Sequence, residues 1–357
     1  MNKELTIRQV CLFFIAFLPA TKVILLPSVL ANFANQDLYF SVIISSLIDI
    51  FTVISILYVY KKHGKSFFEL LETRFGKVFK NIILALYFFY FLIKAYALLS
   101  EQKNYVNLTL YETVPTIFSF TPFFVVACLL CITKVKTIGR LSDMFFSITI
   151  LSLLLVFALS FSNLDFGAIL PVGINGITNV LKGSYYALNW FGDGVYLLFF
   201  LGSFKLKRKD GLKITLSYAG ACFLILIFSF SFYLAFSSIA HKTFFALTDI
   251  SKYSTVINNV GRVDYIAIFG ILLINVISIS LPLFFQTQIV MEIFNLKKRI
   301  IPAIIICLIH LLLMTFLNDL SVTVQNFIHD NLGWVFLFFS NLFPILLIFL
   351  RRKNEEL

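Results

Sequence analysis

The sequence predicts an all-α membrane protein of ten transmembrane helices, arranged as two inverted repeats of five. Three observations support this. The 357-residue chain is 60% hydrophobic and 13% charged, whereas a soluble domain carries about 25% charged residues. Its apolar runs have the length of about 20 residues that a helix needs to cross the hydrocarbon core. Two of these runs, five runs apart, are interrupted near the middle, as in transporters built from inverted repeats.

The apolar runs are each expected to be helical, because lipid excludes unpaired backbone. No long polar segment separates them, so we expect one membrane domain over 1–357, with repeat one at about 9–161 and repeat two at about 183–350. Segment 61–78 is amphipathic and predicts an interfacial helix, whereas 111–118, 241–262 and 318–331 are expected outer loops. The ten runs are 9–33, 37–60, 79–103, 116–133, 141–161, 183–204, 213–238, 262–293, 301–317 and 333–350.

The basic residues predict the orientation. Of the 29 Lys and Arg residues, 22 fall in the connections on one side, five on the other, and Lys22 and Lys94 lie within runs. Because cytoplasmic loops carry the excess of Lys and Arg, both termini are expected in the cytoplasm. The net charge of +11 is therefore interpreted as a topology signal, and no nucleic-acid partner is expected.

Enzymatic and metal chemistry have little support in the sequence. All five cysteines lie in apolar runs, and the C-x-x-C at Cys128 and Cys131 is interpreted as two buried thiols in a helix. The chain has four histidines and no P-loop, H-E-x-x-H or catalytic-triad signature. We therefore expect neither an enzyme nor a bound cofactor or metal.

The two interrupted runs each carry an ionisable residue at the interruption. In the sixth run, "LNWFGDGVYLLFF", Gly192 and Gly194 flank Asp193. In the first run, "FFIAFLPATKVILLPSVLA", Pro19 disrupts the helical hydrogen bonding and Lys22 follows it. As a continuous helix the first run would measure about 37 Å, longer than the bilayer core, so it has room for a non-helical break.

A pairing between the two breaks follows from their charges. A lone charge at the bilayer centre costs about 3 kcal/mol, and two opposite charges in contact lower that cost. We therefore predict that Lys22 and Asp193 lie within a few ångströms of each other; alternatively, each snorkels or meets backbone carbonyls separately. Asp49 and Lys94 form a second possible pair, or are unrelated groups that face the bundle or snorkel.

The residues around both breaks resemble those of spore germination permeases, the B subunits of nutrient germinant receptors. The stretches "LTIRQVCLFFIAFLPATKVILLPSVLA" and "GAILPVGINGITNVLKGSYYALNWFGDGVYLLFF" are similar to that family. Leu170 and Pro171 match its "LLP" before the sixth helix, and 24–27 loosely match its "ILxLP". The family is similar to amino acid–polyamine–organocation transporters, so the resemblance implies a LeuT-type five-plus-five fold with broken helices 1 and 6.

The resemblance also implies a function and partners. It implies recognition of a small nutrient such as an amino acid, cooperation with A and C receptor subunits, and a place in the inner membrane of spores. The alternative is a secondary amino acid transporter driven by protons or another cation, and a third interpretation is a structural membrane subunit without a ligand. A receptor and a transporter share this fold, so the sequence separates them only weakly.

The expected ligand-binding residues lie at the breaks and on two neighbouring helices. Glycines are usual in the family near the first break, where this chain has Ala20, Thr21 and Lys22. This difference has three interpretations. The ligand differs from a zwitterionic amino acid, or Lys22 itself pairs with the carboxylate of the ligand, or Lys22 replaces a coupling cation. Glu101 is expected in an outer vestibule. The full expected set is Ala20, Thr21, Lys22, Tyr96, Glu101, Trp190, Phe191, Gly192, Asp193, Gly194, Asn275 and Ser278.

Overall fold

The computed structural model describes residues 5–110, 116–252 and 264–350, and every regular element in these ranges is helical. The α-helices are α1 (Ile7–Lys22), α2 (Leu26–Ala34), α3 (Leu38–His63), α4 (Phe67–Leu110), α5 (Thr116–Ile132), α6 (Val135–Ser160), α7 (Gly176–Ala187), α8 (Val195–Phe200), α9 (Asp210–Phe236), α10 (Ala246–Lys252), α12 (Asp264–Ile293), α13 (Ile300–Phe316), α14 (Ser321–Asn331), α15 (Gly333–Leu337) and α16 (Phe343–Leu346). Short 3₁₀ turns (Asn35–Asp37, Phe161–Asn163, Phe166–Ile169, Ser237–Lys242, Leu347–Phe349) and a π-helical turn (Phe338–Leu342) join them.

The helices are apolar enough for a membrane protein. Within the described ranges, five are individually long and apolar enough to cross a bilayer, and α13 with α14 forms a sixth candidate bent by 109°. Helices α1, α7 and α8, with 16, 12 and 6 residues, are too short to qualify alone, and α2 is counted with α3 in the candidate span Leu26–His63. The all-α membrane fold with broken first and sixth helices is therefore confirmed, whereas the number ten stays a prediction.

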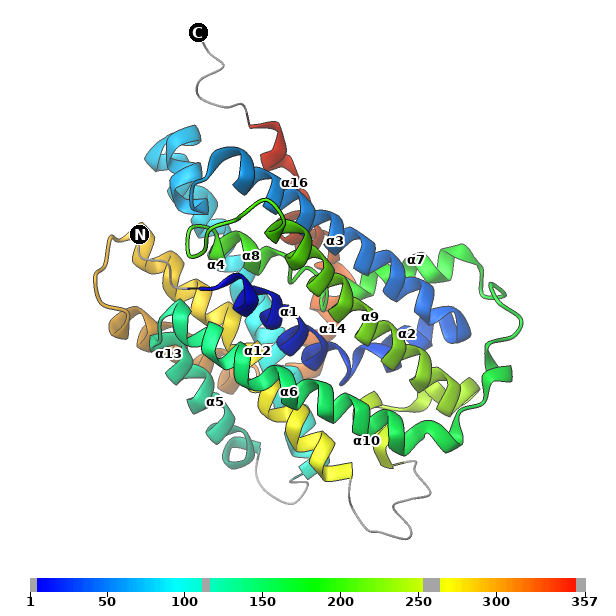
Figure 1. Ribbon diagram of the computed structural model, residues 1–357. Coiled ribbons are helices and arrows are strands. Elements are labelled where there is room, and N and C mark those ends of the chain that lie inside the picture. Colours follow the sequence, from blue (N-terminus) through cyan, green and yellow to red (C-terminus); the bar gives the residue numbers. More distant parts are fainter. Residues whose placement is uncertain (1–4, 111–115, 253–263, 351–357) are drawn as a thin grey trace.

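Helix α1 lies at the centre of the bundle (Figure 1) and packs against α6, α9 and α12. Its start is fixed by a capping box, in which Thr6 and Gln9 exchange hydrogen bonds between side chain and backbone. Phe13 and Phe17 are buried on this helix, and Phe13 meets Phe200 of α8 edge to face, with ring centroids 5.1 Å apart. This packing holds the two broken helices side by side.

The first break lies between α1 and α2. Pro19, expected to cause the interruption, lies inside α1, and the helix continues to Lys22. Val23 then ends it, with its N–H donating to the Pro19 carbonyl at 3.0 Å. The next helix begins at Leu26, with Pro27 in its first turn, where the missing N–H costs no hydrogen bond.

The second break runs from residue 188 to 194, between α7 and α8. Gly192 has a φ of +85°, a conformation that residues with a side chain rarely adopt. A Cβ added there would also lie 2.5 Å from the side chain of Ser340. The sequence therefore needs a glycine at this position for two independent reasons, backbone conformation and close approach.

One expected loop is wrong, because much of 318–331 forms helix α14. Its 11 residues carry Asn, Gln, His and Asp among few apolar side chains, so the segment does not have the composition of a transmembrane run. It is helical because it packs against α4 and its Ile328 is buried there. The sharp bend after α13 folds α14 back over the breaks.

The remaining expected connections can be compared only in part. The amphipathic segment 61–78 begins with the last three residues of α3, and its residues from Phe67 onward form the first part of α4, which is kinked at Gly76. Phe67, Leu70 and Leu71 are buried against the protein. The expected outer loop 241–262 contains the end of a 3₁₀ turn and α10. Residues 111–115 and 253–263 of the expected loops lie outside the described residues.

Candidate functional site

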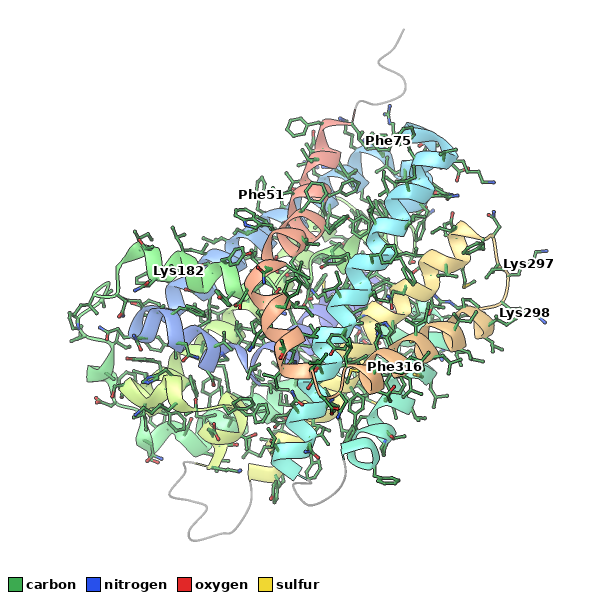
Figure 2. The ribbon with its side chains drawn as sticks, turned by 180° about the vertical axis from the view of Figure 1, so that it is seen from behind. Phe51, Phe75, Lys182, Lys297, Lys298 and Phe316 are labelled. Atoms are coloured by element: carbon green, nitrogen blue, oxygen red, sulfur yellow. The ribbon has the colours of Figure 1, made fainter. Side chains whose placement is uncertain are left out.

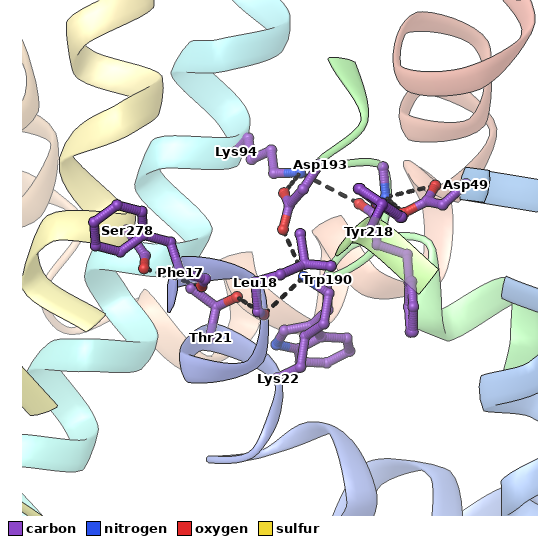
Figure 3. Close-up of polar contacts among 12 residues, drawn as sticks. Phe17, Leu18, Thr21, Lys22, Asp49, Lys94, Trp190, Asp193, Tyr218 and Ser278 are labelled. Atoms are coloured by element: carbon purple, nitrogen blue, oxygen red, sulfur yellow. Dashed lines mark hydrogen bonds and ion pairs between the residues drawn. The ribbon is translucent and has the colours of Figure 1, made fainter. Parts of the chain in front are cut away.

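Asp193 holds two ammonium groups at the second break (Figure 3). Its Oδ2 lies 2.5 Å from the Nζ of Lys22, and its Oδ1 lies 2.8 Å from the Nζ of Lys94. The predicted Lys22–Asp193 contact is therefore confirmed. The three side chains come from α1, the break before α8, and α4, and all are buried. We call Lys22, Lys94 and Asp193 the break centre.

Backbone carbonyls complete the shell around both lysines. Lys22 Nζ donates to the carbonyl of Leu18 at 3.3 Å, in the last turn of α1, where the helix dipole favours a cation. Lys94 Nζ donates to the carbonyl of Phe191 at 3.2 Å. Aromatic rings add to this, since Lys22 lies 5.5 Å from the Phe191 ring centroid and Lys94 5.3 Å from that of Tyr196.

Asp49 supports the second break from α3 instead of pairing with Lys94. Both its carboxylate oxygens accept from the Gly192 N–H, at 3.0 and 2.8 Å. The Tyr218 hydroxyl donates to Oδ2 at 2.6 Å, and the Asn341 amide donates to Oδ1 at 2.8 Å. The second possible pair, Asp49 with Lys94, is therefore wrong, because depth along a helix does not reveal which way each side chain points.

On the side towards α14, Trp190 covers the break centre. Its indole Nε1 donates to Glu101 Oε2 at 2.9 Å, and its ring stacks on the His329 ring at a centroid distance of 4.5 Å. Asn189 approaches His329 Nδ1 at 2.8 Å, and Tyr186 donates to Asp330 at 2.7 Å. We call this contact between 186–190 and α14 the α14 cover.

Glu101 has an unusual environment. Its side chain is 6% exposed, and its Oε1 has no hydrogen-bond partner in the described parts of the chain. The structure thus buries the residue that we expected in an open vestibule. The Glu101 carboxyl group therefore has one oxygen bonded to Trp190 and one oxygen without a partner among the described residues.

A small cavity of about 10 Å³ lies next to the break centre. That is about the volume of one water molecule, and far less than an amino acid occupies. Helices α1, α4, α8 and α12 and the second break contribute to it. Its lining is Phe13, Phe17, Leu18, Thr21, Lys94, Leu98, Trp190, Asp193, Tyr196, Ser278 and Leu281.

The expected site residues separate into two groups. Thr21, Trp190, Asp193 and Ser278 line the cavity. Lys22, Phe191, Gly192 and Gly194 do not line it but belong to the break centre or to the second break beside it. Ser278 donates to the carbonyl of Phe17 at 3.1 Å, which ties α12 to α1.

Three further expected residues lie neither in the cavity lining nor at the breaks' charged groups or the α14 cover. Ala20 is buried in α1, and Tyr96 is buried in α4, but neither lines the cavity. Asn275 of α12 donates to Gln102 of α4, so its amide joins two helices. Such polar contacts between helices are common in membranes and explain the Asn275 side chain without a ligand.

Sequence reasoning missed the link from Lys94 to Asp193 and the role of His329. Lys94 was visible as an intramembrane charge, and a second cation near a lone carboxylate could have been considered. His329 gave no such signal, because it lies in the segment expected to be a loop.

The fold and the two breaks define a class, the LeuT-like membrane proteins. The chain resembles the crystal structure of an Eremococcus coleocola manganese transporter in complex with an aromatic bis-isothiourea substituted compound, with a TM-score of 0.56, 13% identity, and coverage of 95% of this chain and 77% of the transporter. A mutant of that transporter gives a TM-score of 0.56 and 12% identity over the same shares of the two chains. At such identity the likeness concerns the fold alone.

The family follows from the sequence comparison. Residues 4–323 match the spore germination protein family, so the chain belongs to that family. Spore germination protein A2 of Bacillus subtilis (strain 168) is 31% identical over 205 residues, which is 56% of this chain and 54% of that protein. The matching region thus spans about half the length of this curated relative.

Proposed function

We propose that this chain is the membrane-embedded B subunit of a spore germinant receptor. In this proposal it recognises a small, amino-acid-like nutrient at the break centre and passes the signal to A and C subunits in the spore inner membrane. Membership of the spore germination protein family supports the receptor role. The geometry of the break centre supports recognition at that place.

The observation that carries the proposal is the sharing of Asp193 by two buried ammonium groups, at 2.5 and 2.8 Å. A ligand carboxylate can take over one ammonium while Asp193 keeps the other, because two cations can serve two carboxylates. Helix α2 begins at Leu26, four residues after Lys22, so its N-terminus adds partial positive charge at the first break. The break centre is therefore suited to an anionic group.

The rest of the ligand must be accommodated by movement, since the cavity of about 10 Å³ is too small for an amino acid. The α14 cover lies over one side of the cavity through Trp190 and His329. A ligand that binds the open arrangement more tightly shifts the population towards it by that difference in affinity. In a receptor this shift is transmitted to partner subunits.

A second function, proton- or cation-coupled secondary transport of amino acids, is favoured by the likeness of the fold to a manganese transporter. A metal cargo fits this chain poorly. Two ammonium groups already hold Asp193, and no cluster of three or more His, Cys, Asp or Glu suited to a metal occurs in the described ranges. Transport, if it occurs, would then use a proton or another monovalent cation.

A reconstitution experiment separates the two functions. The chain is placed in proteoliposomes, with and without A and C subunits, and uptake of each of the twenty amino acids is measured in radiolabelled form. Spores that carry the same subunits are tested for germination with the same amino acids. The proposal predicts germination that depends on all three subunits and no sustained uptake. Sustained uptake by this chain alone, driven by a proton gradient, would instead establish the transporter.

A further inference from the structure

A second, larger cavity lies on the side of the molecule whose connections carry most of the Lys and Arg residues. Its volume is about 630 Å³. The walls come from the α5–α6 linker, the segment after α8, the end of α12, and the loop before α13 (Figure 1). The lining residues are Lys134, Val135, Ser203, Gln288, Met291, Glu292, Asn295, Leu296, Lys297 and Arg299.

Three basic side chains give this cavity its charge. Lys134 and Lys297 are exposed, and the ammonium group of neither forms an ion pair or hydrogen bond with any described residue. Lys297 extends outward from the loop before α13, beside Lys298 (Figure 2). Arg299 is fixed in place, since its Nη1 donates to the Thr133 carbonyl and its guanidinium lies 4.2 Å from the centroid of the Phe284 ring.

The one acidic side chain of the lining, Glu292, shares the ammonium group of Lys80 with Glu72. Glu292 Oε1 lies 3.0 Å from Lys80 Nζ, and the same ammonium contacts Glu72 at 2.5 Å. The lining therefore carries three basic side chains against one carboxylate, and that carboxylate already contacts Lys80, which is not part of the lining. Lysine and arginine groups arranged in this way are typical of sites for a phosphate group.

Further features of the cavity fit a phosphate. Helix α13 begins at its edge, with Arg299 as the N-cap, so the first backbone N–H groups of a 17-residue helix add partial positive charge there. Gln288 and Asn295 supply side-chain amides as donors. Phe294 and Ile301, next to the cavity residues in the chain, are 68% and 64% exposed and offer apolar surface for acyl chains.

We propose that this cavity binds a phosphate group, carried by an anionic phospholipid headgroup or free in solution. Basic pockets between helices at the cytoplasmic side of a membrane protein bind such headgroups. The site is separate from the break centre, with no lining residue in common. The proposal is therefore independent of the nutrient that the break centre recognises.

The test compares the double variant Lys134→Gln/Lys297→Gln with a matched control, Lys182→Gln/Lys242→Gln, whose lysines are exposed on the opposite connections. The purified full chain is titrated with phosphatidylglycerol, and with phosphatidylcholine for comparison, and bound lipid is counted by native mass spectrometry. In a second arm, inorganic phosphate is titrated by calorimetry. Each surface lysine contributes about fivefold to anionic lipid affinity, so the double variant should lose about 25-fold.

The two arms identify the source of the phosphate. A selective loss of phosphatidylglycerol binding in the cavity variant supports the proposal and names the headgroup. A selective loss of inorganic phosphate binding, with lipid binding unchanged, supports it and names free phosphate. The proposal is overturned if wild-type protein binds neither probe, or if the cavity variant and the control bind both probes equally.

Discussion

Two buried ammonium groups depend on the single carboxylate of Asp193. Removing that carboxylate breaks two ion pairs, whereas removing either lysine breaks only one. A buried charge that loses its partner costs about 3–5 kcal/mol. Asp193→Asn is therefore expected to lower stability by at least that amount, and Lys22→Met or Lys94→Met by clearly less.

Thermal unfolding of the detergent-purified variants, followed by tryptophan fluorescence, measures this ranking. Each lysine variant keeps one complete ion pair, and so serves as the control for the aspartate variant. An Asp193→Asn protein as stable as Lys22→Met would contradict the idea that Asp193 holds both lysines.

Gly192 is the second residue whose identity the structure demands. Gly192→Ala forces a side chain into a φ of +85° and against Ser340, at 2.5 Å. Strained backbone of this kind costs about 1–3 kcal/mol, before the clash with Ser340 is added. The variant is expected to unfold at a lower temperature and to lose the hydrogen bond from its N–H to Asp49.

Gly220→Ala is the matched control. It lies in α9, a Cβ added there would have no described atom within 4 Å, and alanine favours a helix by up to about 1 kcal/mol. Equal unfolding temperatures for the two alanine variants would show that the break tolerates a side chain.

At the scale of the element, α14 is held over the second break by a few polar contacts. Tyr186 and Asn189 bond to Asp330 and His329 of that helix. Each such bond contributes about 1 kcal/mol, so Tyr186→Phe with Asn189→Ala should raise the population of a displaced α14 about tenfold to thirtyfold. Labelling of Thr21→Cys, in the cavity lining, by a water-soluble maleimide reports that displacement.

The control for this experiment is Asn179→Ala, which removes an exposed bond within α7 that does not reach α14. Labelling of the cavity cysteine should accelerate in the double variant and remain unchanged in the control. Equal rates in both would mean that α14 does not cover the cavity.

At this scale, the breaks were predictable from the sequence, whereas helix α14 was not. The second break was predictable because two glycines flank a charge in the middle of an apolar run, and the first because Lys22 follows a proline within a run longer than the bilayer core, although the helix continues past Pro19 to Lys22. The contact between Lys22 and Asp193 followed from their similar depth. The helix α14 was not predictable, since an 11-residue polar segment is helical only through its tertiary contacts.

The partner of Lys94 was also beyond the sequence. Lys94 and Asp49 lie at suitable depths on two long helices that are consecutive in the chain, yet the structure directs Lys94 to Asp193 and Asp49 to a backbone N–H. Which partner each side chain meets depends on the rotation of its helix about the helix axis. Runs that are apolar on all sides do not indicate that rotation.

At the scale of the whole molecule, the distribution of basic residues predicts the orientation. The connections around 205–213 carry five Lys and Arg residues and should face the cytoplasm, while the connection at 237–242 should face outward. Alkaline phosphatase, which is active only outside the cytoplasm, should be active when inserted after Lys242 and inactive when inserted after Lys207. The reverse activities would invert the topology.

The central claim is that the break centre is where the nutrient binds, and equilibrium binding to a Lys22→Met variant tests it most directly. This variant keeps the Lys94–Asp193 pair, so it should fold, and Lys242→Met on an outer connection is the matched control. Equilibrium dialysis is performed with each of the twenty amino acids in radiolabelled form. We expect the wild type and the control to bind the same amino acid and the Lys22→Met protein to bind it at least tenfold more weakly, because a charge-assisted contact to a carboxylate is lost. Folded Lys22→Met protein that binds with unchanged affinity would contradict the account.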